Sequence, residues 1–246
     1  MPDVLRAHAK LTLSLRVTGV RDDRYHLLDA EMVSLDLADT LEFSAGDGLE
    51  MELDTGGFAG TVPSGSIPLD DENLVRRALK VLGRRAHVRL HKRIPAGAGL
   101  GGGSADAAAV LRWAGVVDLD LAATLGADVP FCLVGGRARV TGVGETVEPL
   151  DVDLIAGRAY TLLTPPLHVS TVEVYRQWDR MGGPTGDNGN DLEPAALAAY
   201  PDLAVWRNRL GDDTGETPML AGSGGTWFVE GDFPESGRVV RVCRPS

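Results

Sequence analysis

The sequence lacks the features of secreted, membrane-spanning and zinc-binding proteins. Its 246 residues include two cysteines, Cys132 and Cys243, which are too few for a disulfide framework or a cysteine-based zinc site. No stretch approaches the ~20 apolar residues that a helix needs to cross a membrane. Residues 1–6 carry no apolar core of signal-peptide length. We therefore expect a cytoplasmic protein that has no membrane partner.

Positive charge is also scarce. The chain has 24 lysines and arginines against 35 aspartates and glutamates, which gives a formal net charge of −11. Nucleic acids and anionic membranes bind basic surfaces, so we expect no nucleic-acid partner and look for a small-molecule substrate instead. Only Lys10, Lys80 and Lys92 are lysines among 24 basic residues, so each lysine is an unusual choice of cation here.

Glycine, in contrast, is concentrated in residues 95–104, here called the glycine loop, and an alanine-rich helix former follows it directly. Glycine lets the backbone adopt positive φ and approach a ligand closely. The start of a helix directs free N–H groups and the positive end of its dipole at such a loop. The segment therefore predicts a phosphate-binding site rather than a flexible linker. The candidate residues are Pro95, Ala96, Gly97, Ala98, Gly99, Leu100, Gly101, Gly102, Gly103 and Ser104, the last of which could also cap the helix or meet a metal ion.

Two familiar phosphate-binding loops fit this segment poorly. Residues 97–102 satisfy G-x-G-x-x-G, and Asp118 lies at about the distance of a ribose-binding acid. However, a dinucleotide-binding fold needs a continuous apolar strand before the loop, whereas residues 87–94 alternate between apolar and polar side chains. Gly103 stands where a Walker loop has its lysine. We therefore disfavour a nicotinamide-dependent dehydrogenase and a Walker-type nucleotidase.

The periodicity of the chain predicts an α+β fold, because partly solvated strands alternate with segregated helices. A domain boundary is expected near residues 150–158, residues 56–70 are expected to form a loop, and residues 126–131 a tight connection, because Pro130 disfavours helix at Val129. We expect strands at residues 6–17, 27–37, 39–54 with a turn at 46–48, 87–94, 133–140, 145–150, 160–163 and 238–242. We expect helices at residues 71–82, 104–113, 119–125, 171–181 and 192–210, the last interrupted near Pro201.

The order of short motifs along nearly the whole chain resembles the GHMP small-molecule kinases. These motifs are Ala9-Lys10-Leu11, Tyr25-His26, Asn73-Leu74, the glycine loop with Ala105-Asp106-Ala107-Ala108, Leu125-Gly126-Ala127-Asp128-Val129-Pro130-Phe131, Asn190-Asp191-Leu192 and Gly222-Ser223-Gly224. The resemblance implies an ATP-binding N-terminal domain over residues 1–152, like ribosomal protein S5 domain 2. It also implies a ferredoxin-like C-terminal domain over residues 153–246, shortened at its end.

The same resemblance implies an ATP-dependent kinase that uses Mg²⁺ and acts as a monomer or homodimer. The Tyr-His pair and the Leu-Gly-Ala-Asp-Val-Pro-Phe segment point to the branch whose substrate is a polyol linked to cytidine diphosphate, phosphorylated on its 2-hydroxyl in the non-mevalonate isoprenoid pathway. Thr12, Arg24, Ala105 and Ala221 depart from the residues usual in the family. Two alternatives stay open: another GHMP kinase, acting on mevalonate, homoserine or a sugar, and a non-catalytic nucleotide-binding relative.

The resemblance also assigns roles, each with a plainer alternative. It implies Asp128 as the base for the acceptor hydroxyl, with Lys10 beside it, whereas most aspartates next to glycine and proline only form turns or helix caps. It implies Asn73 near the adenine, although helix capping explains Asn73 equally well. Asp106 could cap or support the glycine loop, and Ser104 could bind Mg²⁺. For the substrate, the resemblance implies Tyr25 and Tyr175 as rings stacked on cytosine, His26 at the edge of the base, and Thr12 as a separate substrate contact. The plainer alternative for Tyr175 is a core aromatic. Gly222, Ser223 and Gly224 are also implied near the substrate, and their plainer alternative is a tight turn.

Overall fold

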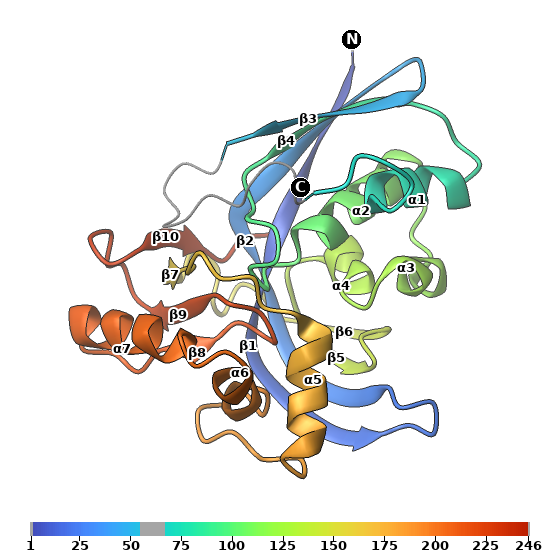
Figure 1. Ribbon diagram of the computed structural model, residues 1–246. Helices are drawn as coiled ribbons and strands as arrows, with labels where there is room; N and C mark the ends of the chain where they lie inside the picture. Colours follow the sequence, from blue (N-terminus) through green and yellow to red (C-terminus); the bar gives the residue numbers. More distant parts are fainter. Residues whose placement is uncertain (1, 55–66, 246) are drawn as a thin grey trace.

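The computed structural model describes residues 2–54 and 67–245, so most of the loop expected at residues 56–70 lies outside the described residues. Two sheets and seven helices are found in this part of the chain (Figure 1). The strands are β1 (Asp3–Val20), β2 (His26–Ser44), β3 (Gly48–Leu53), β4 (His87–Lys92), β5 (Arg137–Gly142), β6 (Thr146–Leu150), β7 (Ala159–Leu163), β8 (Met219–Leu220), β9 (Trp227–Glu230) and β10 (Arg238–Arg241). The helices are α1 (Leu74–Val81), α2 (Gly102–Trp113), α3 (Leu119–Leu125), α4 (Val129–Val134), α5 (Thr171–Arg180), α6 (Glu193–Ala199) and α7 (Leu203–Thr214).

The first sheet has the order β3-β4-β2-β5-β6, and β1 pairs with β2 in a long antiparallel ribbon. Helix α2 packs against β1 and β2, and α1, α3 and α4 pack around α2. Residues 105–111 of α2 are all buried, because its alanines let neighbouring elements approach closely from every side. Helices α1–α4 therefore cover the first sheet on the side where the glycine loop ends (Figure 1).

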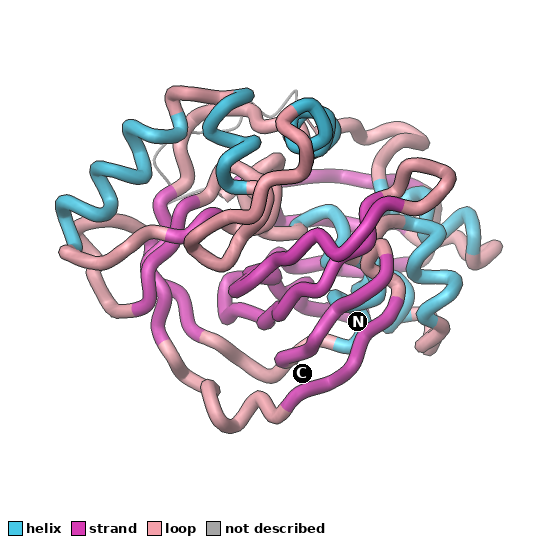
Figure 2. The backbone as a smooth tube through the Cα atoms, turned by 90° about the horizontal axis from the view of Figure 1, so that it is seen from below, coloured by secondary structure: helices cyan, strands magenta, loops and turns pink. Residues whose placement is uncertain are grey.

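The second sheet has the order β10-β7-β9-β8 and is accompanied by α5, α6 and α7. In the view from below, the strands run through the molecule and the helices flank them (Figure 2). A cluster of buried side chains joins the second sheet to the first and includes Leu11 of β1, Leu35 of β2 and Phe228 of β9. The boundary expected near residues 150–158 falls between β6 and β7, and the division into two domains stays a prediction.

The middle of β1 is buried on both faces. The alternation of residues 6–17 predicts one apolar and one solvated face, but residues 7–12 are all buried, including Lys10 at 5% exposure and Thr12 at 2%. The reason is tertiary, since two glycine segments lie against these side chains. A Cβ atom added at Gly101 would lie 2.7 Å from Lys10 Cγ, and one added at Gly222 would lie 3.5 Å from Thr12 Oγ1. A register shift in the β1–β2 pairing falls between His8 and Lys10.

The α+β class is confirmed, and several local predictions are wrong. Residues 129–134 form helix α4 rather than a connection and the start of a strand, because a proline in the first turn of a helix sacrifices no hydrogen bond. Residues 27–44 lie in one strand, β2, where two were predicted, and β3 pairs in parallel with β4. No helix in residues 2–54 and 67–245 is long and apolar enough to cross a membrane.

Candidate active site

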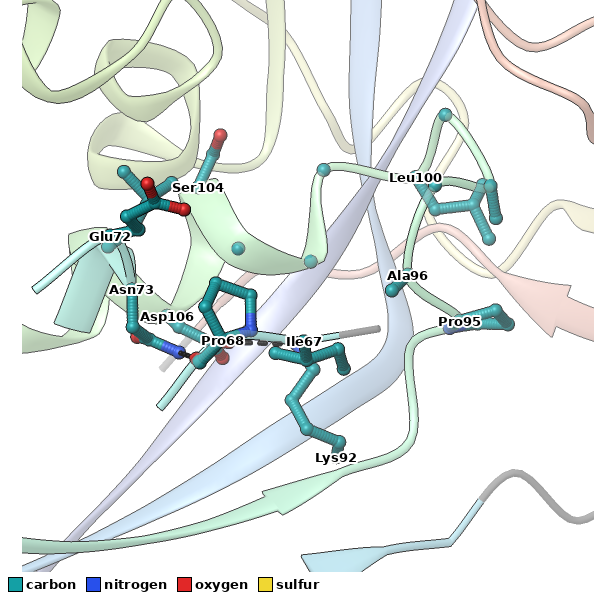
Figure 3. Close-up of a pocket in the computed structure, with 17 residues that line it drawn as sticks. Ile67, Pro68, Glu72, Asn73, Lys92, Pro95, Ala96, Leu100, Ser104 and Asp106 are labelled. Carbon is teal, nitrogen blue, oxygen red and sulfur yellow. Dashed lines mark hydrogen bonds and ion pairs between the residues drawn. The ribbon is translucent and has the colours of Figure 1, made fainter. Parts of the chain in front are cut away.

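A cavity of about 330 Å³ lies between the start of α1 and the glycine loop (Figure 3). Asn73 and Pro68 border it on one side, and Pro95 and Ala96 on the other. Asn73 caps α1, since its side chain accepts from the Val75 N–H and donates to the Pro68 carbonyl. Capping therefore explains Asn73, and it lines the cavity as well. The full lining is Ile67, Pro68, Glu72, Asn73, Leu74, Lys92, residues 95–104 and Asp106.

The glycine loop is a fixed structure rather than a solvated linker. Ala98 and Leu100 are buried in the cluster between the two sheets, with exposures of 3% and 1%. Gly97, Gly99 and Gly101 alternate with these two anchors and adopt φ of 71°, 78° and 68°, which side-chain-bearing residues rarely adopt. The apolar side chains point into the core, and the glycines allow the backbone between them to turn.

Helix α2 begins at Gly102, two residues before the predicted start. Gly101 occupies the capping position, and no described side chain caps the helix. The first N–H groups of α2 therefore lack a partner within the helix, and they border the cavity. This is the arrangement that binds phosphate groups at helix starts.

The loop also touches the second glycine cluster, residues 222–225. A Cβ atom added at Gly99 would lie 2.6 Å from the Ala221 carbonyl oxygen and 2.9 Å from the Gly224 Cα. Two backbones thus pass each other where no side chain fits, and this contact fixes the loop against the second sheet. The role of Gly222, Ser223 and Gly224 in substrate binding stays a prediction, and the Ser223 hydroxyl lies 2.9 Å from that of Thr171.

Lys10 lies against Gly101 of the glycine loop and forms an ion pair with Asp128. Lys10 Nζ lies 3.4 Å from Asp128 Oδ2 and donates to Thr12 Oγ1 at 3.1 Å. The Lys10 side chain is 6% exposed, whereas that of Asp128 is 32% exposed. Asp128 precedes α4 but makes no capping hydrogen bond, so the plainer reading of this aspartate does not describe its side chain. A buried cation thus faces a carboxylate that remains open to an incoming molecule.

Tyr25 and His26 lie at the other end of the site, at the turn between β1 and β2. Tyr25 is 63% exposed, and Arg24 before it adopts φ 68°, the left-handed conformation that the glycine usual in the family would adopt without strain. Tyr175 packs its ring on that of His26 with centroids 4.7 Å apart. Burial raises the pKa of Tyr175, and the charge of Asp128 raises it further. Tyr175 thus packs on His26 from α5, an element of the other half of the chain.

Three comparisons place this geometry among known proteins. The profile of the GHMP kinases N terminal domain matches residues 73–136, which contain the glycine loop and Asp128. The 4-diphosphocytidyl-2-C-methyl-D-erythritol kinase of Ruegeria pomeroyi is 36% identical over 97% of this chain and 94% of its own length. The enzyme of that name from Pelotomaculum thermopropionicum is 38% identical over 95% of this chain and 91% of its own. The chain belongs to the 4-diphosphocytidyl-2-C-methyl-D-erythritol kinases, a family within the GHMP kinases.

Solved structures agree with this membership. The crystal structure of a 4-(cytidine 5'-diphospho)-2C-methyl-D-erythritol kinase superposes with a TM-score of 0.73 at 32% identity, over 99% of this chain and 100% of that one. The mevalonate kinase of Methanococcus jannaschii superposes with a TM-score of 0.61 at 12% identity, which shows a shared fold. As a GHMP kinase the chain is an ATP-dependent phosphotransferase. The binding of phosphate by the glycine loop stays a prediction.

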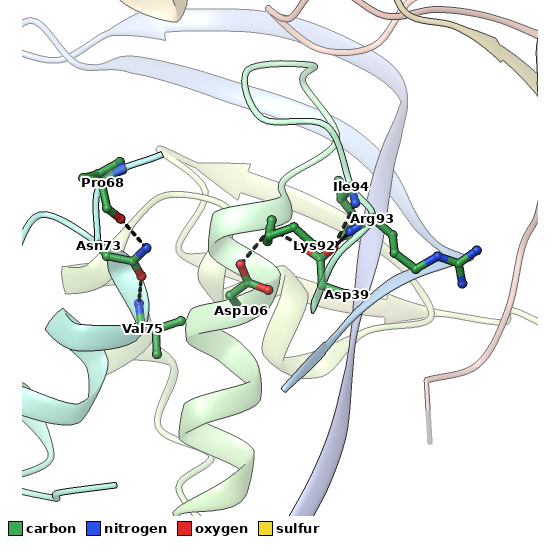
Figure 4. Close-up of polar contacts among 8 residues, drawn as sticks. All are labelled: Asp39, Pro68, Asn73, Val75, Lys92, Arg93, Ile94 and Asp106. Atoms are coloured by element: carbon green, nitrogen blue, oxygen red, sulfur yellow. Dashed lines mark hydrogen bonds and ion pairs between the residues drawn. The ribbon is translucent and has the colours of Figure 1, made fainter. Parts of the chain in front are cut away.

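One feature of this kinase site is not predicted from the sequence: an ion cluster of Asp39, Lys92 and Asp106 (Figure 4). Lys92 Nζ contacts Asp39 Oδ2 and lies 2.8 Å from Asp106 Oδ2, and all three side chains are buried. Asp39 also accepts the N–H groups of Arg93 and Ile94 at the entry to the glycine loop. Asp106 does not cap α2; instead the cluster joins both ends of the loop to β2.

Charge and burial oppose each other in this cluster. Burial by itself lowers the pKa of Lys92, but the charges of Asp106 and Asp39 outweigh it, so the pKa of Lys92 lies above its ordinary value. Burial raises the pKa of Asp106, and Lys92 offsets only part of that rise. A usable signal was present in the sequence, because Lys92 is one of three lysines and shares a strand face with Val88 and Leu90.

The donors near the loop also fit Mg²⁺, which the kinase family implies. No group of three or more His, Cys, Asp or Glu side chains that could hold a metal exists within residues 2–54 and 67–245. Mg²⁺ rarely needs such a cage, because it keeps several waters and binds substrate phosphates with one or two protein oxygens. The half-buried Ser104 lines the cavity, and its hydroxyl is a suitable oxygen donor for the ion.

Proposed function

We propose that this kinase transfers the γ-phosphoryl group of ATP to the 2-hydroxyl of 4-diphosphocytidyl-2-C-methyl-D-erythritol, in the non-mevalonate isoprenoid pathway. The observation that carries the proposal is the contact of Lys10 with Asp128 at 3.4 Å, next to the uncapped start of α2. Phosphoryl transfer asks a protein to position two substrates and to neutralise charge, and these elements supply both. The names of the relatives supply the substrate.

In this proposal the cavity holds ATP. The adenine lies toward Asn73 and Pro68, and the phosphates lie against the N–H groups of residues 101–104. The helix dipole of α2 stabilises the negative charge of the phosphates. Mg²⁺, when bound through Ser104 and the phosphates, would supply further positive charge to the phosphoryl group.

The acceptor hydroxyl approaches Asp128, which is the exposed member of the pair. As the hydroxyl oxygen bonds to the γ-phosphorus, its proton passes to Asp128, and the bond from the γ-phosphorus to the bridging oxygen breaks to leave ADP. The Lys10 ammonium stabilises the charge that develops on the phosphoryl oxygens. Thr12 accepts a hydrogen bond from Lys10 and so orients it.

The test is ADP release by the purified chain with separate acceptors. We expect turnover with 4-diphosphocytidyl-2-C-methyl-D-erythritol and only background release with mevalonate, homoserine or a hexose. Equal or greater turnover with one of those acceptors would assign the chain to another GHMP kinase activity. Absence of turnover with all of them, by a folded protein that binds ATP, would favour the non-catalytic alternative.

A further inference from the structure

His26 is held by one face of a helix that belongs to the other half of the chain. Tyr175, Trp178 and Asp179 of α5 follow one another at spacings of three and one, so they share a helix face. The Tyr175 ring packs on the imidazole at 4.7 Å, and Trp178 meets its edge at 5.4 Å with an interplanar angle of 85°. Asp179 Oδ1 lies 2.8 Å from His26 Nε2. Figure 1 shows α5 standing beside the turn-proximal ends of β1 and β2.

The contact with Asp179 determines which ring nitrogen carries the proton. An ionised carboxylate only accepts hydrogen bonds, so Nε2 must be the donor. The neutral imidazole then has no proton on Nδ1, which becomes an acceptor. Among the described residues, no other hydrogen bond to the His26 ring is found. With 10% of its side chain exposed and both ring contacts in place, His26 presents Nδ1 in a fixed direction.

We propose that Asp179 is a positioning residue that makes the site select cytosine over uracil, by holding His26 with its proton on Nε2. The inference rests on the proposed function, which brings a cytidine diphosphate group to Tyr25 and His26. Cytosine presents an amino group at position 4, a hydrogen-bond donor, where uracil presents a carbonyl acceptor. An acceptor Nδ1 attracts the first and repels the second.

The first test compares the binding of cytidine diphosphate and uridine diphosphate by calorimetry. We expect the wild-type protein to prefer cytidine diphosphate by roughly ten- to a hundred-fold, as one well-placed base contact allows. Asp179→Ala should lose most of this preference while keeping its KM for ATP, and Asp179→Glu should restore part of it. Asp213→Ala is the matched control, because it makes the same change at an exposed acid that pairs with Arg209 on α7; the Asp213 side chain is 43% exposed and that of Asp179 is 52% exposed.

The second test reads the imidazole directly. Long-range ¹H–¹⁵N spectra of histidine-labelled protein, assigned with a His26→Gln variant, should show the Nε2-protonated form in the wild type and a mixture of forms in Asp179→Ala. This measurement needs no substrate, so it tests the role of Asp179 separately from the proposed kinase activity. Turnover with unchanged base preference in Asp179→Ala, or an Nδ1-protonated His26 in the wild type, overturns this inference alone. Failure of the wild type to phosphorylate the cytidyl substrate overturns the proposed function.

Discussion

Two residues carry the proposed chemistry, and their exposures suggest how they divide it. The Lys10 side chain is buried and that of Asp128 is open, so in the proposed reaction the carboxylate meets the acceptor hydroxyl and the ammonium stabilises the charge on the phosphoryl group. Asp128→Asn keeps the shape but loses the charge, and kcat should fall by roughly 10²–10⁴ with little change in ATP affinity. Lys10→Ala should act similarly, and the double variant should lose much less than the sum of the two, because residues that act together fail together.

Steady-state kinetics of the single and double variants measure this coupling. Asp118→Asn provides a control, since Asp118 is also an aspartate before a helix but only caps α3 through the Leu121 N–H. Near wild-type kcat in a folded Asp128→Asn protein would exclude Asp128 as the base. Additive losses of kcat would show that Lys10 acts on the ATP phosphates independently of Asp128.

At the same scale, the exposed Tyr25 ring is available to stack on a base. A base stacked on an aromatic ring is worth about 1–3 kcal/mol. Tyr25→Ala should therefore weaken binding of the cytidyl substrate by roughly ten- to a hundred-fold and leave ATP binding unchanged. Calorimetric titration with each ligand measures this difference. Weakening of ATP instead would place the cytidine pocket elsewhere.

At the scale of secondary-structure elements, the position of the glycine loop depends on the contact between Gly99 and the second glycine cluster. An alanine at Gly99 would bring its Cβ within 2.6 Å of a backbone oxygen and so displace the loop. We expect Gly99→Ala to raise KM for ATP by about ten- to a hundred-fold, because small displacements of positioning groups carry such costs. Gly83→Ala is the matched control, since Gly83 has φ 61° but no neighbouring atom within 4 Å. Equal effects of both variants would show that backbone strain at a positive φ, and not the contact with the second glycine cluster, raises KM.

The ion cluster of Asp39, Lys92 and Asp106 also connects secondary-structure elements, because it joins the glycine loop to β2. Lys92→Met would leave Asp39 and Asp106 buried without their cation, which typically costs about 3–5 kcal/mol of unfolding free energy. Lys80→Met should cost about 0–1 kcal/mol, because Lys80 pairs with Asp71 at the surface. Adding Asp106→Asn to Lys92→Met should recover part of the loss. Urea denaturation of the four proteins measures these differences, and similar stability for Lys92→Met and Lys80→Met would contradict a structural cluster.

The whole molecule has a continuous interior. One cluster of buried apolar side chains includes Val110 of α2 and Trp227 of β9, and thus crosses the predicted boundary between residues 1–152 and 153–246. We therefore expect a single cooperative unfolding transition in scanning calorimetry, with equal calorimetric and van't Hoff enthalpies. Two resolved transitions would show instead that the two predicted domains unfold independently.

Much of the site could be predicted from the chain alone, because it depends on local backbone chemistry. The glycine loop and the helix after it follow from residues adjacent in sequence, whose conformational freedom and helix propensity decide the structure directly. Periodicity also found most strands, although it could not separate a helix start from a turn at Pro130. The roles of Lys10 and Asp128 came from resemblance, since nothing local shows that residues 118 positions apart meet.

Tertiary structure alone decided which polar groups face one another. Lys92 meets Asp39 across 53 residues, and His26 meets Asp179 across 153. A sequence reports which side chains prefer water, but a second layer of structure can cover a polar face. On β1, Gly101 of the glycine loop lies against Lys10, and Gly222 lies against Thr12. Once water is excluded, each buried charge needs a partner from whichever element packs against it, so those partners could be identified only in the folded chain.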